Sequence, residues 1–297
     1  MRYTGQRRRR LRRAKRACLG FLSCFVLWCV WGVWQSCHHP VTREWTVDLP
    51  QLDGPVRLAV LSDLHDMDFG GDNRRLVELT AAEKPDLILL DGDMLNSYSE
   101  SSGRVCSLVR HLADIAPVYY AWGNHELEYM ERKTSPLEAE LTAAGAVVLD
   151  RSFADLTVNG RRLRLGGLYD YAFALDDFNT CDPAHMDPEV YGFLSEFQDT
   201  DRCRILLSHR PDSFVFGEAC ATWGVELVIS GHDHGGQVVL PFLGGVFGGD
   251  QGLFPEYIHG LYEKDGIRLA ITSGLGTHRE ILPRMWNPPE IMLLNLS

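Results

Sequence analysis

Five short runs of apolar residues stand out along the chain, and a polar cluster containing Asp, Asn or His follows each of them. The runs cover residues 58–61, 87–90, 118–121, 205–207 and 227–229. They are too short for helices and rich in aliphatic and aromatic residues, so they predict central strands that are covered on both faces. Because neighbouring strands of such a sheet carry their carboxyl ends to one edge, the polar clusters are expected to converge there.

Other segments predict a mixed α/β domain around these strands. Residues 74–83 and 135–144 have the pattern of helices, and residues 156–158 and 162–165 flank Asn159-Gly160, which is a strong signal for a hairpin turn. Residues 56–297 suit one catalytic domain, since no internal repeat or low-complexity linker interrupts them. Residues 35–55 are expected to hold a linker and a first strand.

The N-terminus has the composition of a membrane anchor. Residues 2–16 contain nine Lys or Arg and no acidic residue, and residues 17–34 carry no charge. Eighteen helical residues span about 27 Å, close to the thickness of the bilayer core, which predicts a transmembrane signal-anchor at 17–34. The positive-inside rule then places the basic segment 1–16 in the cytoplasm and the catalytic domain on the extracytoplasmic face. A cleaved or twin-arginine export signal and a nucleic-acid-binding arm are the alternatives.

The polar clusters contain the residue types of a two-metal hydrolytic site. Carboxylates, imidazoles and an amide can hold two cations that act on an in-line displacement at phosphorus, and a bound water becomes hydroxide near neutral pH. A mixed set of nitrogen and oxygen ligands suits Mn, Fe or Zn better than Mg. The candidate residues are Asp63, His65, Asp93, Asn124, His125, His209, His232 and His234. Any one of these motifs alone is more often a turn or a cap than a ligand.

The five motifs in their order resemble the calcineurin-like metallophosphoesterases. These motifs are Asp-x-His, Gly-Asp, Gly-Asn-His-Glu, a lone His after a strand, and Gly-His-x-His. Residues 231–237, 240–244 and 287–291 are similar to the membrane-anchored bacterial branch of that family, and the resemblance runs from about Val56 to the C-terminus. It implies a four-layer αββα sandwich, here preceded by one transmembrane helix. It also implies hydrolysis of phosphodiester or pyrophosphate bonds, with a phosphomonoesterase or a catalytically silent metal-binding scaffold as alternatives.

The resemblance also implies a role for each candidate residue. Asp63, His65 and His234 would hold the first metal, while Asn124, His209 and His232 would hold the second. Asp93 would bridge the two metals. His125 would contact the scissile phosphate and assist the leaving group rather than bind metal, and an imidazole suits such general acid work.

One residue departs from the family pattern. The family often continues Gly-Asp-x-x-Asp, whereas this chain has Asn96 at the last position. Because that residue usually supports a ligand rather than binding metal, the sequence predicts altered hydrogen bonding and retained activity.

Charge narrows the choice of substrate. The chain has a net charge of −11, and without the nine basic residues of its first sixteen, 20 Lys and Arg remain against 40 Asp and Glu. The rest of the chain therefore carries about −20, which makes nucleic acid an unlikely partner. A small or lipid-linked phosphoester fits better, and the enzyme is expected to act as a monomer.

The remaining histidines and the cysteines are expected to be structural. His38, His39, His111, His185, His259 and His278 lie outside the motifs, although His278 follows a glycine-rich stretch and could touch substrate. Five of the eight cysteines lie beyond the apolar segment, which permits a disulfide but leaves one thiol over.

Two unusually apolar stretches near the expected site have two interpretations. Residues 238–247 and 282–286 could form a lipid-facing rim, or they could form a hairpin packed into the core. The packed hairpin is the favoured expectation, because apolar runs punctuated by glycines commonly pack in that way.

Overall fold

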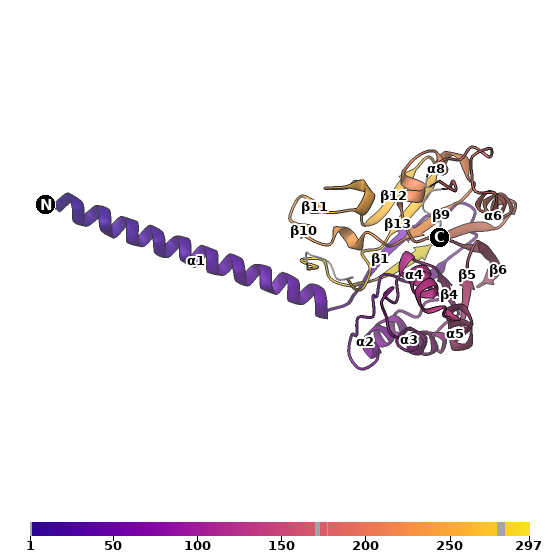
Figure 1. Cartoon of the computed structure of the whole chain (residues 1–297), viewed down its shortest axis with the longest axis horizontal. Coiled ribbons are helices and arrows are strands. Elements are labelled where there is room, and N and C mark those ends of the chain that lie inside the picture. The colour runs from indigo at the N-terminus through magenta and orange to yellow at the C-terminus, as the bar shows by residue number, and fades with distance from the viewer. Residues whose placement is uncertain (1, 170–172, 177, 278–282) are drawn as a thin grey trace.

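The computed structural model describes residues 2–169, 173–176, 178–277 and 283–297, with side chains from residue 11 onward (Figure 1). The described helices are α1 Arg2–His38, α2 Arg74–Glu83, α3 Gly103–Ala113, α4 Asn124–Lys133, α5 Leu137–Ala144, α6 Pro188–Gln198, α7 Asp212–Val215 and α8 Ala219–Thr222, with 3₁₀ turns η1 His234–Gly236 and η2 Gly249–Gln251. The described strands are β1 Val41–Val47, β2 Val56–Leu61, β3 Leu87–Asp91, β4 Val118–Ala121, β5 Ala146–Leu149, β6 Ser152–Val158, β7 Arg161–Leu168, β8 Cys203–Ser208, β9 Leu227–Ser230, β10 Val239–Leu240, β11 Gly244–Gly245, β12 Gly260–Lys264, β13 Ile267–Ile271 and β14 Glu290–Leu296.

Two sheets of six strands form the centre of the domain. The first has the order β1-β14-β2-β3-β4-β5, in which β2 to β5 run parallel and β14 runs antiparallel to β2. The second has the order β12-β13-β9-β8-β7-β6, in which β13, β9, β8 and β7 run parallel. The C-terminal strand β14 therefore completes the sheet that begins the domain.

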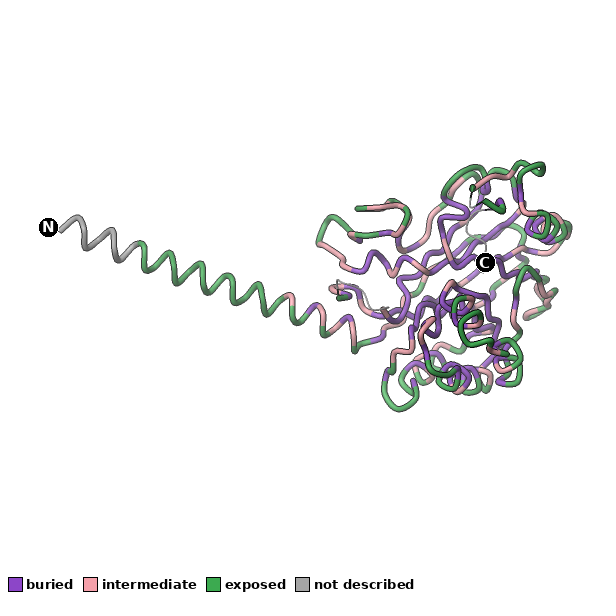
Figure 2. The backbone as a smooth tube through the Cα atoms, viewed as in Figure 1, coloured by how far each residue is buried: buried purple, intermediate pink, exposed green. Residues whose placement is uncertain are grey.

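The buried side chains arrange these sheets as two inner layers. One core cluster joins the facing sides of the sheets, with Val60 and Leu89 from the first packed among Ile205 and Ile229 from the second. Helices α2, α3 and α5 cover the outer face of the first sheet, and α6, α7 and α8 cover that of the second. Figure 2 shows this buried interior between two more exposed outer layers. The four-layer αββα sandwich is confirmed.

The apolar pattern located the strands correctly but did not assign them to the two sheets that the family resemblance implies. All five runs are strands, and all are almost completely buried, as the lack of polar positions within them predicts. They belong to two sheets rather than one: β2, β3 and β4 to the first, β8 and β9 to the second. The predicted helix at 74–83 is confirmed, and the one at 135–144 begins at Leu137. Asn159 and Gly160, with φ of 51° and 81°, make the predicted hairpin turn.

Helix α1 is longer than the apolar segment and projects from the domain (Figure 1). Its part Leu11–His38 is long and apolar enough to cross a membrane, a property that a signal sequence shares. The C-terminal turns of α1 pack against the segment before β14, where the Trp28 and Trp286 rings lie 4.7 Å apart. A Cβ on Gly32 would meet the Trp286 ring at 2.6 Å, so only glycine permits this approach.

The favoured expectation of a packed hairpin at 238–247 is wrong for its tip. Strands β10 and β11 do pair, but Phe242 is fully exposed and the Leu243 side chain is 63% exposed. The two strands form a small sheet that joins neither six-stranded sheet, so the turn lies outside the layers that bury the other strands. The cysteines, in contrast, are unremarkable: all eight are free thiols.

Candidate active site

Two loops at the carboxyl ends of β2 and β3 are held together by their backbones. The Asp63 amide donates to the Gly92 carbonyl and the His65 amide donates to the Asp93 carbonyl, both at 3.0 Å. A Cβ on Gly92, whose φ is 71°, would meet the His209 ring at 2.7 Å. Glycine at this position therefore lets the second sheet approach the first.

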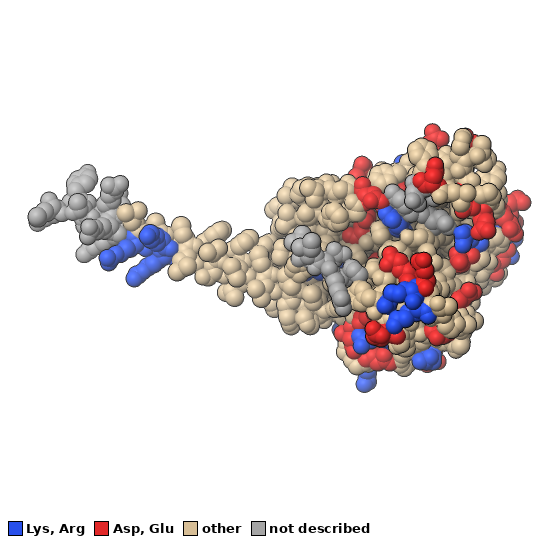
Figure 3. Space-filling view, viewed as in Figure 1, with Lys and Arg blue, Asp and Glu red and all other residues tan. Residues whose placement is uncertain are grey.

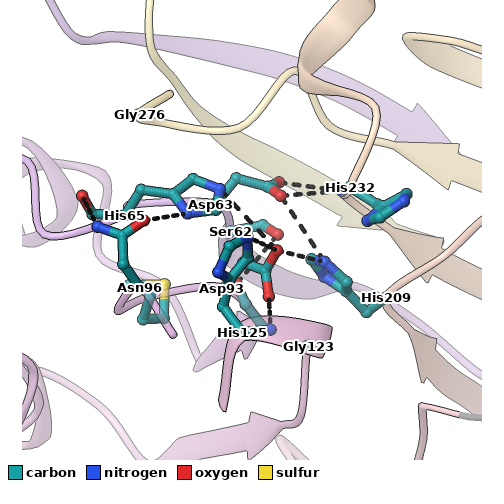
Figure 4. Close-up of polar contacts among 12 residues, drawn as sticks. Ser62, Asp63, His65, Asp93, Asn96, Gly123, His125, His209, His232 and Gly276 are labelled. Atoms are coloured by element: carbon teal, nitrogen blue, oxygen red, sulfur yellow. Dashed lines mark hydrogen bonds and ion pairs between the residues drawn. The ribbon is translucent and has the colours of Figure 1, made fainter. Parts of the chain in front are cut away.

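Asp93 lies at the centre of the candidate site (Figure 4). Its Oδ1 accepts a hydrogen bond of 2.9 Å from the His125 amide. Its Oδ2 lies 3.2 Å from Nε2 of His209 and 3.9 Å from Nε2 of both His65 and His125. One carboxylate is thus shared by imidazoles from both sheets.

The second sheet contributes the remaining histidines from the ends of β8 and β9. His209 donates from Nδ1 to the Asp91 carbonyl at 2.7 Å, which fixes the tautomer and directs Nε2 toward Asp93. The His232 amide donates to Oδ1 of Asp63 at 3.0 Å. Both contacts cross from one sheet to the other, so the two sets of motifs meet as the sequence predicts.

Five of the candidate residues have left-handed backbones. Asp63, His65, Asp93, His232 and His234 all have φ between 47° and 67°. Residues other than glycine rarely adopt this backbone region, because it strains them. Residues that do adopt it are held there by the surrounding structure, and they cluster at functional sites. The tight turns aim these short side chains inward from loops that lie directly after strands.

The candidate ligands form two groups. Ligand atoms of Asp63, His65 and His234 lie within 4.8 Å of one another, and so do those of Asp93, His209 and His232. Among the described residues, the buried atoms Oδ1 of Asn124 and Nδ1 of His234 have no hydrogen-bond partner. Buried polar atoms without partners are costly, and these would be satisfied by cations. The donor set fits two divalent metals that accept both nitrogen and oxygen.

The electrostatics favour the metal-binding protonation state at Asp93, His232 and His234 but not at His209. Burial alone would lower the pKa of His209, but the neighbouring Asp93 raises it well above its usual range, so a metal would have to displace a proton there. Burial lowers the pKa of His232 well below its usual range and that of His234 to about 3, so both rings are neutral near pH 7. Burial alone would raise the pKa of Asp93, but the neighbouring His209 lowers it, so this carboxylate is ionised. Neutral imidazole and carboxylate are the forms that bind metal.

His125 is held in a tautomer that can donate a proton. The Ser97 amide donates to Nδ1 of His125 at 3.1 Å, so in the neutral ring the proton lies on Nε2. His125 is nearly buried at the start of α4 and faces Asp93. A group with this geometry can donate to an oxygen in the site.

Asn96 supports His65 through its amide. Its Nδ2 donates to the His65 carbonyl at 2.9 Å and to Oδ2 of Asp66 at 3.0 Å. Its Oδ1 therefore accepts from Nδ1 of His65, 3.1 Å away, which leaves the lone pair of that ring on Nε2. These are the hydrogen bonds of the amide in this chain; the altered bonding relative to Asp and the retained activity both stay predictions.

Glu126 has a supporting role that the sequence did not indicate. Its fully buried carboxylate accepts hydrogen bonds from the amides of Asp93, Met94 and Gly123 and from the Tyr120 hydroxyl, at 2.7–3.0 Å. These bonds fix the β3 loop to the start of α4. In the sequence, Glu126 ends the Gly-Asn-His-Glu motif, but an acid in the first turn of a helix is also a common capping pattern, so the motif did not indicate this role.

The segment before β14 supports His234. Nδ2 of Asn287 donates to the His234 carbonyl at 2.6 Å. The backbone amide of Asn287 donates to Oγ of Ser36 at 2.9 Å, which links this segment to α1. The fully buried Arg284 donates to the carbonyls of Gly276 and Asn287, and burial lowers its pKa to about 10. In the sequence, the only sign of these hydrogen bonds is Arg284, a single charged residue within the apolar stretch 282–286.

Three of the other described histidines make their contacts outside this cluster. His259 bonds to Glu290, His185 bonds to Asp182, and His38 bonds to the Trp34 carbonyl. His278 lies outside the described residues, so its suggested contact with substrate stays a prediction.

Comparison with known proteins identifies related sequences. Residues 56–236 match the family described as Calcineurin-like phosphoesterase. The chain is 31% identical to the putative metallophosphoesterase F40B5.2 of Caenorhabditis elegans over 69% of its length, but it spans only 42% of that protein. It is 29% identical to the uncharacterized metallophosphoesterase YkuE of Bacillus subtilis, covering 81% of this chain and 79% of YkuE. It is 26% identical to phosphodiesterase YaeI of Escherichia coli, covering 82% of each chain.

Proposed function

The chain belongs to the calcineurin-like phosphoesterase family, and from that premise we propose that it is a membrane-anchored phosphodiesterase with a two-metal centre between its sheets. Hydrolysis of phosphoesters is the activity of this family. The observation that carries the proposal is the convergence of Asp93 with imidazoles from both sheets. The printed name of YaeI supports a diester as the substrate class.

The proposed ligand sets follow the two groups of donor atoms. Asp63, His65 and His234 hold one cation, Asn124, His209 and His232 hold the other, and Asp93 contacts both. Mn, Fe or Zn suits this mixture of imidazole, carboxylate and amide. When bound, two such cations acidify a water molecule and stabilise charge on the phosphoryl oxygens.

His125 supplies the proton in this proposal. Its Nε2–H donates to a phosphoryl oxygen or to the departing alkoxide, while the Ser97 amide holds Nδ1 as an acceptor. The bond to Ser97 therefore keeps the ring turned with its proton toward the reacting atoms. General acid catalysis of this kind contributes about 10²–10⁴-fold to rate.

Helix α1 holds the catalytic domain at a membrane in this proposal. The exposed apolar residues of α1 extend to Trp28, Trp31 and Trp34, and Trp is enriched at membrane interfaces. The basic residues precede the apolar stretch, so the positive-inside rule puts the domain on the extracytoplasmic face. A small or lipid-linked phosphoester is the proposed substrate, because the acidic domain surface disfavours nucleic acid (Figure 3).

The test compares a diester with a monoester. The full chain in detergent micelles with Mn²⁺ is expected to hydrolyse bis-p-nitrophenyl phosphate faster than p-nitrophenyl phosphate. Asp93→Asn is expected to abolish this turnover, whereas Asp265→Asn, in the exposed turn between β12 and β13 at the opposite edge of the second sheet, leaves it unchanged. Preference for the monoester would establish a phosphomonoesterase instead. Absence of turnover with two metals bound would favour the scaffold.

A further inference from the structure

The segment that follows His234 exposes an unusual group of large apolar side chains. We define the apolar hairpin as residues 238–247, which includes β10 and β11. Phe242 is fully exposed, and Leu243 and Phe247 are 63% and 51% exposed. No Lys, Arg, Asp or Glu occurs between Asp233 and Asp250. Contiguous exposed apolar surface rimmed by polar residues marks an interaction site.

The apolar hairpin lies on the side of the domain from which α1 leaves. Figure 1 shows β10 and β11 beside the C-terminal turns of α1, away from α6 and β6. Figure 3 shows uncharged surface over the C-terminal half of α1 and the adjoining part of the domain, while basic side chains lie near the start of α1 and charged side chains of both signs gather on the rest of the domain. Uncharged surface therefore extends from the C-terminal half of α1 to the side of the domain that carries the hairpin.

The base of the apolar hairpin is fixed to both the candidate site and α1. The Val246 amide donates to the carbonyls of Val238 and Gly236, at 2.9 and 3.2 Å, and Gly236 ends the 3₁₀ turn that begins with His234. The Val239 amide donates to the Met285 carbonyl at 3.0 Å. The next residue, Trp286, packs against Trp28 of α1. The hairpin is thus held in one position relative to α1.

We propose that the apolar hairpin inserts into the interface of the same bilayer that α1 crosses, as a second membrane contact of the enzyme. This inference rests on the proposed anchoring through α1. A bilayer is the occupant that the structure favours, because the exposed apolar side chains of the hairpin are tied through Met285 and Trp286 to a helix that is itself apolar enough to cross a membrane. The candidate site then lies beside the lipid headgroups, where it can reach the phosphate of an amphiphile that stays in the membrane.

Photo-crosslinking of the full chain tests this contact. p-Benzoylphenylalanine replaces Phe242 or Leu243, and the protein is reconstituted into vesicles of palmitoyl-oleoyl-phosphatidylcholine. Phe178 and Leu175 are matched controls, since they are 66% and 80% exposed. Asn179, the neighbour of Phe178, bonds to the Phe216 carbonyl, which places the control segment near α7 and α8. Light should produce lipid adducts at 242 and 243 and none above the dark background at 178 and 175.

Each outcome decides the proposal. Lipid adducts confined to 242 and 243 support it. Adducts to a second copy of the chain, equal lipid adducts at all four positions, or no adducts at 242 and 243 would overturn it. Extraction of the wild-type chain from vesicles by alkaline carbonate would show separately that α1 does not anchor the protein. Turnover of bis-p-nitrophenyl phosphate should be unchanged in all four variants, because none of these residues touches the site.

Discussion

The two sheets contribute unequally to the candidate active site. The first provides Asp63, His65, Asp93, Asn124 and His125 from the segments that follow β2, β3 and β4. The second provides His209, His232 and His234 and no candidate proton donor. We call the residues from the first sheet the first half of the site and those from the second sheet the second half. The first half is held by its own residues, since Glu126 bonds the β3 loop to the start of α4. The support of His234 comes instead from Asn287, far along the chain, and through it from α1.

This difference shows that one site can have a self-contained half and a half that depends on distant segments. Substitutions in the first half should alter chemistry or stability directly. Substitutions behind His234 should weaken metal binding and leave the fold intact.

The largest expected effect comes from removing the proton donor of the first half. His125→Ala should lower kcat by about 10²–10⁴-fold, because no other described group replaces its Nε2–H. Metal content, measured by mass spectrometry of the purified protein, should stay at two ions. Loss of metal with normal turnover by the remaining metallated enzyme would contradict the assigned role.

Breaking the support within the first half should destabilise the protein. Glu126→Ala leaves the buried amides of Asp93, Met94 and Gly123 without their acceptor, so the free energy of unfolding should fall by about 3 kcal/mol. Glu128→Ala, on the exposed face of the same helix, is the control. Denaturation in detergent micelles without metal measures the difference, and equal stability of the two variants would remove the proposed role of Glu126.

Breaking the support of the second half should instead weaken metal binding. Asn287→Ala removes the hydrogen bond to the His234 carbonyl, and loss of such outer contacts typically weakens affinity by about 10–100-fold. Titration with a chelator should show this for one of the two metals. Asn295→Ala, which affects a contact with Arg57 away from the site, should bind both metals normally.

Asn96→Asp probes the smaller contribution of hydrogen bonding around His65. A carboxylate at this position would face Oδ2 of Asp66, to which the amide now donates. Restoring the common family residue should therefore lower stability by about 1 kcal/mol and bring no gain in activity. A several-fold increase in kcat would show that the amide itself limits the enzyme.

The smallest expected effect is the contribution of Glu290, the first residue of β14, to the pH dependence of the free energy of unfolding. Burial alone would raise the pKa of Glu290, but the hydrogen bond and charge of His259 and the charge of Arg43 lower it below the ordinary value of 4.5. The ionised form is favoured by folding, so this contribution is present above pH 4.5 and is lost as the pH falls through the folded pKa. The difference in melting temperature between wild type and Glu290→Gln should therefore shrink in acid. A difference that grows in acid would have the wrong sign.

The sequence predicted most of the first half of the site and less of what supports the second. Buried strands are visible as apolar runs, and the turns that follow them carry the candidate residues in short motifs. Which sheet a strand joins depends on long-range pairing, so β8 and β9 could not be separated from β2 to β4 by pattern alone. Asn287 and Arg284 act through backbone carbonyls, and no local pattern records which carbonyl a distant side chain will reach.

Exposure was also hard to predict from composition. Residues 238–247 have the apolar character of a core hairpin, yet Phe242 faces outward because the turn has no layer to cover it. Apolar composition indicates removal from water, but only the structure distinguishes a protein core from a surface available to lipid.

The contact between Ser36 and Asn287 bears on proteolytic release of the domain. A protease that cut α1 between Ser36 and Cys37 would remove both Ser36 and Trp28 from the domain, and with them the contacts to Asn287 and Trp286, while leaving every candidate ligand in the released fragment. The shed fragment would keep its sheets but lose part of the packing behind His234. The released fragment would therefore lose activity without any inhibitor. With the proposed membrane anchor, hydrolysis would then be confined to enzyme molecules that are still attached to the membrane.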